Sequence, residues 1–231
     1  MYLGETLTTD VASIFSASWT KRNGQVVPDT TDVNLGNDAV LLNGTVLYAD
    51  LAESTNLVSN YSPEFAGEIY KAYLLSASRV IKANGGVITA FDGDRVMAVF
   101  IGDGKNSAAA RTALSINYCV HYIINPVIKR QYPASTYLLE QAVGIDTSES
   151  LIARTGIRGS NDLVWVGRAA NYAAKLCSLR LPGYPSWITR EVFDSLNDAS
   201  KYGKDGSPMW EARYWADYNV TVYRSNWWWS V

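Results

Sequence analysis

The sequence has little cysteine, one histidine and no long apolar run, and each shortage excludes a kind of structure. No stretch of about 20 apolar residues occurs, so no membrane-spanning helix is expected. Cys119 and Cys177 form no CxxC pair and, with His121 alone, give no zinc site. We interpret them as two buried free thiols, with a disulfide as the alternative. The opening "MYLGETLTTDVASIF" lacks the basic and apolar regions of a secretory signal, so we expect a cytoplasmic protein.

An excess of basic charge is also missing. The chain has 20 Lys and Arg against 22 Asp and Glu, and the net charge is -2. No basic surface therefore indicates nucleic acid as a partner. A phosphate-bearing ligand would need local lysine, arginine, backbone amides or metal ions. The 231 residues, 48% of them hydrophobic, are enough for one core with an extension.

Predicted strands and helices alternate along the chain. The first strong strand is "GTVLYADL", residues 44–51, and a helix follows over residues 62–86 with Ser62 as its N-cap and Pro63 in its first turn. Two β-rich runs around "FDGD" predict a hairpin. Such an order favours an α+β fold, with a catalytic domain over residues 44–231 and an extension over residues 1–43. The other predicted elements are a helix at 106–124 that Pro126 stops or bends, a strand at 137–146 followed by a polar loop, a strand at 162–167, a helix at 168–179, and β elements with a short helix between 186 and 225.

Two aspartates lie where predicted strands end. Asp50 closes the first strand, and Asp94 lies at the hairpin tip. If these strands are neighbours, the two carboxylates meet at one edge of the sheet. Two close carboxylates repel unless a cation neutralises them, and their oxygens suit Mg²⁺ or Mn²⁺. The alternative is that both are solvated turn residues.

Two further segments fit a site for a nucleoside triphosphate. "LAESTN", which follows Asp50 and contains Ser54 and Thr55, offers consecutive backbone N–H groups that can bind phosphates. Asn171 and Lys175 are four residues apart on a predicted helix, so they share a face. An amide and an ammonium presented together are able to fix a ribose and counter phosphate charge; an ordinary exposed pair is the alternative.

Taken in order, these segments resemble the catalytic domain of class III nucleotidyl cyclases. The resemblance is carried by "VLYADLAEST", "FDGDRVMAVF" and "VGIDTSESL…DLVWVGRAANYAAKL", and it covers roughly residues 44 to 224. It implies a ferredoxin-like (βααββαβ) domain with an antiparallel-rich sheet and helices packed on it. It also implies an enzyme that converts a nucleoside triphosphate to a 3′,5′-cyclic monophosphate and pyrophosphate.

The resemblance assigns roles to particular residues. Two divalent cations, Mg²⁺ or Mn²⁺, would bind at Asp50, Leu51 and Asp94. Asn171 would orient the ribose, and Lys175 stands where the family usually has arginine. A lysine near the C-terminus that often touches the phosphates in the family has no clear match. The family's head-to-tail arrangement implies a homodimer in which each site combines Asp50 and Asp94 of one chain with Asn171 of the other.

The positions that read a purine base in the family are apolar in this sequence. They are Ala90 and Val164, and neither side chain forms a hydrogen bond, so a purine edge would stay unpaired. The sequences of these motifs resemble those of the pyrimidine cyclases of bacterial anti-phage (Pycsar-type) systems. In such systems a separate effector protein binds the cyclic nucleotide product. Tyr48 faces the same side of its strand as Asp50 and is a candidate for reading the base. Arg95 is a second candidate, although alternation from Asp94 predicts that it faces away. We expect a UTP cyclase; CTP or purine cyclases and a non-catalytic nucleotide-binding module are the alternatives.

Overall fold

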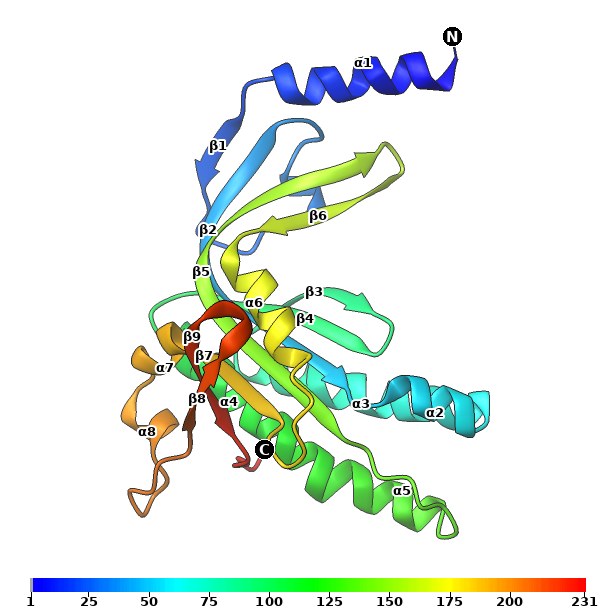
Figure 1. Cartoon of the computed structure of the whole chain (residues 1–231), viewed down its shortest axis with the longest axis vertical. Coiled ribbons are helices and arrows are strands. Elements are labelled where there is room, and N and C mark those ends of the chain that lie inside the picture. Colours follow the sequence, from blue (N-terminus) through cyan, green and yellow to red (C-terminus); the bar gives the residue numbers. More distant parts are fainter. Residues whose placement is uncertain (1) are drawn as a thin grey trace. The chain divides into compact units, whose positions relative to one another are not determined.

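The computed structural model describes residues 2–231, which divide into two compact units (Figure 1). The first unit contains the chain up to Asn43 together with Glu149–Gly167. The second unit contains Gly44–Ser148 and Arg168–Val231. One boundary between the units falls between Asn43 and Gly44, and the segment 149–167 belongs with the N-terminal residues. The division into an extension and a catalytic domain stays a prediction.

The first unit is built from short strands and one exposed helix. Its helix is α1 (Leu3–Ser16), which has no buried residue, and a short 3-10 helix follows at Thr30–Asp32. Strand β1 (Thr20–Asn23) pairs in parallel with the start of β2 (Asp38–Leu51). The end of β5 (Gln141–Ile157) forms an antiparallel hairpin with β6 (Ser160–Val166). The polar loop predicted after residue 146 is therefore wrong, because "TSES" continues the strand and Ser150 is buried within it.

The second unit is an α+β structure with mostly antiparallel strand pairs. The strand order is β3-β4-β2-β5-β7-β9-β8, in which β5 and β7 are parallel.

None of the helices in residues 2–231 has the length and apolar character that crossing a bilayer requires. The remaining strands are β3 (Val87–Asp92), β4 (Arg95–Phe100), β7 (Ser186–Thr189), β8 (Glu211–Trp215) and β9 (Val220–Ser225). The helices are α2 (Ser54–Asn60), α3 (Pro63–Ala83), α4 (Lys105–Tyr118), α5 (Asn125–Gln131), α6 (Arg168–Cys177), α7 (Arg190–Asp194) and α8 (Asp198–Lys201), with a 3-10 turn at Ala216–Tyr218.

The helical boundaries follow the signals in the sequence. The side chain of Ser62 accepts a hydrogen bond from the N–H of Phe65, and Pro63 opens α3, as predicted. The helix predicted over 106–124 is not stopped at Pro126. It passes from α4 through a π-helical segment, Cys119–Ile124, into α5. A proline has no N–H to donate and requires such a local change in the hydrogen-bond pattern.

The central strands of the second unit have two different faces. Leu47, Ala49 and Leu51 on β2 join the main core, which also contains residues of α3 and α4. Since side chains alternate along a strand, Tyr48 and Asp50 point to the other face. On that face α6 lies along β5 (Figure 1). The alternation of β2 therefore takes a carboxylate out of the core and presents it on the side of α6.

The close approach of α6 to β5 depends on Gly144. A Cβ atom at this position would lie 2.1 Å from the carbonyl oxygen of Ala173 and 2.4 Å from the backbone nitrogen of Cys177. Both obstacles are helix backbone, so neither can move aside alone. We expect Gly144→Ala to lower the free energy of unfolding by about 3 kcal/mol, measured by urea denaturation.

Gly67→Ala is the matched control for this prediction. Gly67 lies within α3, and a Cβ atom there would meet nothing within 4 Å. Alanine favours a helix over glycine by up to about 1 kcal/mol, so this variant should be at least as stable as the wild type. Equal stability of Gly144→Ala and the wild type would contradict the close helix–strand contact.

Candidate active site

Asp50 lies at the end of β2 and is bound by two arginines. It is only 4% exposed. Its Oδ2 atom accepts hydrogen bonds from Nη2 of Arg95 at 2.9 Å and from Nη2 of Arg180 at 2.6 Å. A buried carboxylate needs such partners, because burial without them costs several kcal/mol. Both guanidinium groups converge on one oxygen of the predicted metal ligand.

Arg95 faces the site, contrary to the alternation argument. Gly93 has a φ of +59°, and the turn that it forms places Asp94 outside the two strands. Strand β4 begins at Arg95, which lies directly opposite Asp50 in the antiparallel register. Residues directly opposed in such a pair share a face. The guanidinium carbon of Arg95 also lies 5.9 Å from the ring centroid of Tyr48, so the three side chains form one group.

Asp94 has an unsatisfied oxygen. The residue is half-buried at the tip of the β3–β4 hairpin, and its buried Oδ2 atom has no hydrogen-bond partner. Buried polar atoms nearly always have a partner, so this oxygen is open to a ligand. The fully buried Tyr73 has a pKa well above its usual value, first because of burial and then because of negative charges that include Asp50 and Asp94. Asp94 directly precedes Arg95, which lies opposite Asp50 and donates to it, so both carboxylates lie at the same end of the β2–β4 pair.

The two carboxylates fit divalent cations in number and kind. No group of three or more His, Cys, Asp or Glu side chains within residues 2–231 is placed to hold a metal ion. Two carboxylates are enough where substrate phosphates and water complete the shell, as is usual for Mg²⁺. Leu51 is 1% exposed with its side chain in the core, so only its backbone carbonyl oxygen is suited to bind a cation.

Asn171 and Lys175 lie on α6 (Arg168–Cys177). Both are on the exposed face of α6, whose other face is buried. The ammonium of Lys175 donates to the hydroxyl of Tyr218 and lies 4.6 Å from the centre of that ring. The predicted pair does share a face, and that face points outward.

The remaining predicted positions lie in three places. Ser54 and Thr55 form the first turn of α2, after Glu53, which has a left-handed φ of 56°. Ala90 is exposed on β3 of the second unit, and Val164 is 38% exposed on β6 of the first unit. Both apolar positions are exposed, and their role in reading a base stays a prediction.

The thiols are confirmed as free and buried. Burial raises the pKa of Cys177 to about 12, and its Sγ atom donates to the carbonyl oxygen of Ala142 at 3.1 Å. Burial also raises the pKa of Cys119. Both groups stay protonated near neutral pH, so neither is a nucleophile or a thiolate ligand.

Three full-length relatives identify the family. The chain is 48% identical to a uridylate cyclase of Xanthomonas perforans and 46% identical to one of Burkholderia cepacia, with 100% of both chains covered in each case. It is 41% identical to a uridylate cyclase of Rhodovulum sp. (strain MB263), covering 99% of this chain and 98% of the relative. The chain belongs to the uridylate cyclase family. No protein-family model matches it.

Solved structures place this uridylate cyclase in the class III nucleotidyl cyclase fold. A bacterial light-regulated adenylyl cyclase superposes with a TM-score of 0.67 at 22% identity, covering 80% of this chain and 51% of that one. An adenylyl cyclase from P. aeruginosa gives a TM-score of 0.65 at 23% identity, covering 81% and 95%. At these identities the likeness concerns the fold alone, and it confirms the predicted fold class.

The structure of this uridylate cyclase adds residues that the sequence did not single out. Arg168, at the start of α6, donates to the buried Asp146 at 3.1 and 3.2 Å, and Thr189 donates to the same carboxylate at 2.6 Å. Burial raises the pKa of Asp146 in spite of Arg168. This ion pair fixes the N-terminal end of the helix that carries Asn171. Arg180 was also missed, because it follows the helix in a loop with no motif.

Proposed function

We propose that this uridylate cyclase converts UTP to 3′,5′-cyclic UMP and pyrophosphate at sites shared by two copies of the chain. The ribose 3′-oxygen forms a bond to the α-phosphorus and gives up its proton to solvent. The bond from that phosphorus to the oxygen bridging the β-phosphate breaks, and pyrophosphate leaves with the electron pair. The observation that carries the proposal is the hydrogen bond from Arg95 to Asp50, with Asp94 directly before Arg95 in the sequence, in a chain similar to uridylate cyclases over its whole length.

The carboxylates of Asp50 and Asp94 and the carbonyl oxygen of Leu51 would hold two divalent cations, Mg²⁺ or Mn²⁺. When bound, such ions make the attacking oxygen more acidic and stabilise the leaving pyrophosphate. The open Oδ2 atom of Asp94 supports this assignment. Ser54 and Thr55, close in sequence to Asp50, would bind phosphate oxygens through the backbone of the turn.

Tyr48 and Arg95 would read the base. The buried Nε atom of Arg95 has no hydrogen-bond partner, so it is a donor in need of an acceptor. Uracil presents two carbonyl oxygens, whereas cytosine replaces one of them with an amino group, itself a donor. In the proposed orientation the Nε atom of Arg95 faces position 4 of the ring, where cytosine would present its amino group; two donors facing each other leave a buried group unpaired, which costs about 1–3 kcal/mol. This chemistry favours UTP over CTP.

Asn171 and Lys175 of the partner subunit would complete each site. Both side chains lie on the exposed face of α6, where a partner subunit is able to reach them. The similarity to Pycsar-type cyclases further suggests that a separate effector protein reads the cyclic UMP in anti-phage defence; this role rests on the resemblance.

The experiment is turnover of the four nucleoside triphosphates by the purified protein with Mn²⁺. We expect cyclic UMP as the main product, with kcat/KM for UTP at least about tenfold above that for CTP, because of the unpaired donor in the cytosine complex. Equal turnover of ATP or GTP would contradict the pyrimidine assignment. Absence of any cyclic nucleotide would favour a nucleotide-binding module.

A further inference from the structure

Arg180 lies on the loop between α6 and β7 and reaches the proposed metal ligand. We propose that the guanidinium of Arg180 pairs with the carboxylate of Asp50 while no metal is bound. When the metal-bound nucleotide enters, this guanidinium leaves Asp50 and binds the triphosphate. This inference rests on the proposed function and adds a residue to it. In this proposal Arg180 weakens metal binding in the absence of nucleotide and strengthens the binding of the nucleotide.

The conflict at Asp50 Oδ2 is the first argument. That single oxygen accepts from Arg180 at 2.6 Å and from Arg95 at 2.9 Å. The carboxylate is buried, whereas each arginine side chain is 31% exposed. A divalent cation at the same oxygen would sit beside two positive charges, and like charges so close repel strongly. A cation that binds this oxygen therefore displaces at least one of the two guanidinium groups.

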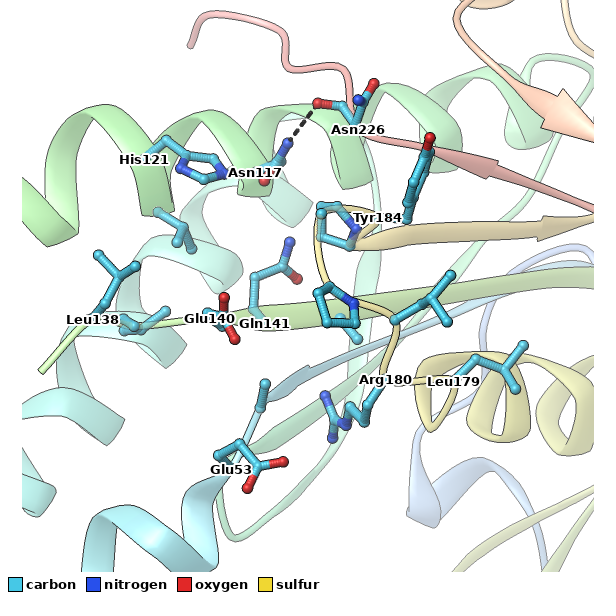
Figure 2. A pocket seen from close by; sticks show the side chains of 18 residues that line it. Glu53, Asn117, His121, Leu138, Glu140, Gln141, Leu179, Arg180, Tyr184 and Asn226 are labelled. Carbon is cyan, nitrogen blue, oxygen red and sulfur yellow. Dashed lines mark hydrogen bonds between the residues drawn. The ribbon is translucent and has the colours of Figure 1, made fainter. Parts of the chain in front are cut away.

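Arg180 is the one that is free to move. Arg95 is fixed by the strand pairing of β4 with β2 and lies over the ring of Tyr48. Arg180 instead belongs to a loop with no strand or helix pairing of its own. It also lines a cavity of about 200 Å³ (Figure 2). The loop and the cavity give its side chain space to turn away from Asp50.

Figure 2 shows the surroundings of this cavity. Arg180 and Glu53 are both on its wall, and Glu53 directly precedes α2. The turn of Ala52 and Glu53 connects Asp50 with Ser54 and Thr55. Arg180 therefore contacts the predicted metal ligand and lines the same cavity as Glu53, the residue before the predicted phosphate-binding turn.

The triphosphate of the nucleotide is a suitable binding partner for the displaced guanidinium of Arg180. A guanidinium binds phosphate oxygens with two parallel hydrogen bonds, and these are stronger than neutral ones. Lys175 lacks such a planar fork, and its ammonium is bound to Tyr218. Arg180 thus supplies a guanidinium, which Lys175 on α6 does not.

The test measures binding, not only turnover. Mn²⁺ binding without nucleotide is followed by electron paramagnetic resonance in the wild type, Arg180→Gln and Arg180→Lys. Removing the competing charge should raise the Mn²⁺ affinity of Arg180→Gln about tenfold, with Arg180→Lys between it and the wild type. Arg190→Gln, the same change at a 64% exposed side chain, is the control and should bind Mn²⁺ as the wild type does.

Nucleotide affinity is measured by calorimetry in Mn²⁺ with the uncleavable analogue α,β-methylene UTP and with UMP. Arg180→Gln should bind the analogue about tenfold more weakly and UMP unchanged, because only the analogue carries β- and γ-phosphates. Unchanged or weaker Mn²⁺ binding, or unchanged affinity for the analogue, would overturn the proposal. If the wild type forms no cyclic UMP, the proposed function itself fails; if it does and Arg180→Gln behaves as the wild type, only the role of Arg180 fails.

Discussion

Asp94→Asn should lower kcat for UTP at least about 10³-fold while the protein stays folded. Loss of a metal-binding carboxylate removes several kcal/mol of transition-state stabilisation, and each 1.36 kcal/mol corresponds to a factor of ten. The fold should persist, because the buried Oδ2 atom of Asp94 makes no hydrogen bond. Turnover is measured by cyclic UMP formation, and folding by circular dichroism.

Asp103→Asn is the matched control for this substitution. Asp103 is exposed in the loop after β4, and its replacement makes the same chemical change away from the site. Its kcat should equal that of the wild type. If Asp94→Asn unfolds, or if it keeps wild-type turnover, Asp94 is not the metal ligand that the proposed reaction needs.

A 1:1 mixture of Asp94→Asn and Asn171→Ala chains should recover about one quarter of the wild-type activity. Random exchange makes half of the dimers mixed, and each mixed dimer has one intact site out of two when Asp94 and Asn171 come from different chains. Each variant alone should be nearly inactive. Cyclic UMP formation after verified subunit exchange is the measurement.

The control mixture combines Asp94→Asn with Asp50→Asn. These two residues belong to the same half of a site, so a mixed dimer has no intact site and no activity should return. Recovery in this mixture, or none in the first mixture despite exchange, would show that the sites are not shared as proposed.

Local signals predicted much of the fold. The cap at Ser62, the proline after it and the apolar spacing determine α3, and the glycine-containing tip determines the β3–β4 hairpin. The continuation of β5 through polar residues was missed, because it depends on pairing with β6. The polarity of the segment alone does not reveal this pairing. The π-helical segment before Pro126 was missed for a similar reason: the chain keeps its helical path through packing.

The site was predicted in part. The positions of Asp50 and Asp94 at predicted strand ends led to their prediction as metal ligands, and that role stays a prediction. The orientation of Arg95 was missed, because a hairpin turn interrupts the alternation on which the argument depended. Arg180 reaches Asp50 across 130 residues of sequence, and no local pattern predicts a contact of that range.

The most direct test is a crystal structure of the wild-type protein with Mn²⁺ and α,β-methylene UTP. We predict anomalous scattering from Mn²⁺ between the carboxylates of Asp50 and Asp94, the uracil beside Tyr48 and Arg95, and the ribose next to Asn171 of the partner subunit. Mn²⁺ bound elsewhere, or a nucleotide held entirely within one chain, would contradict the account.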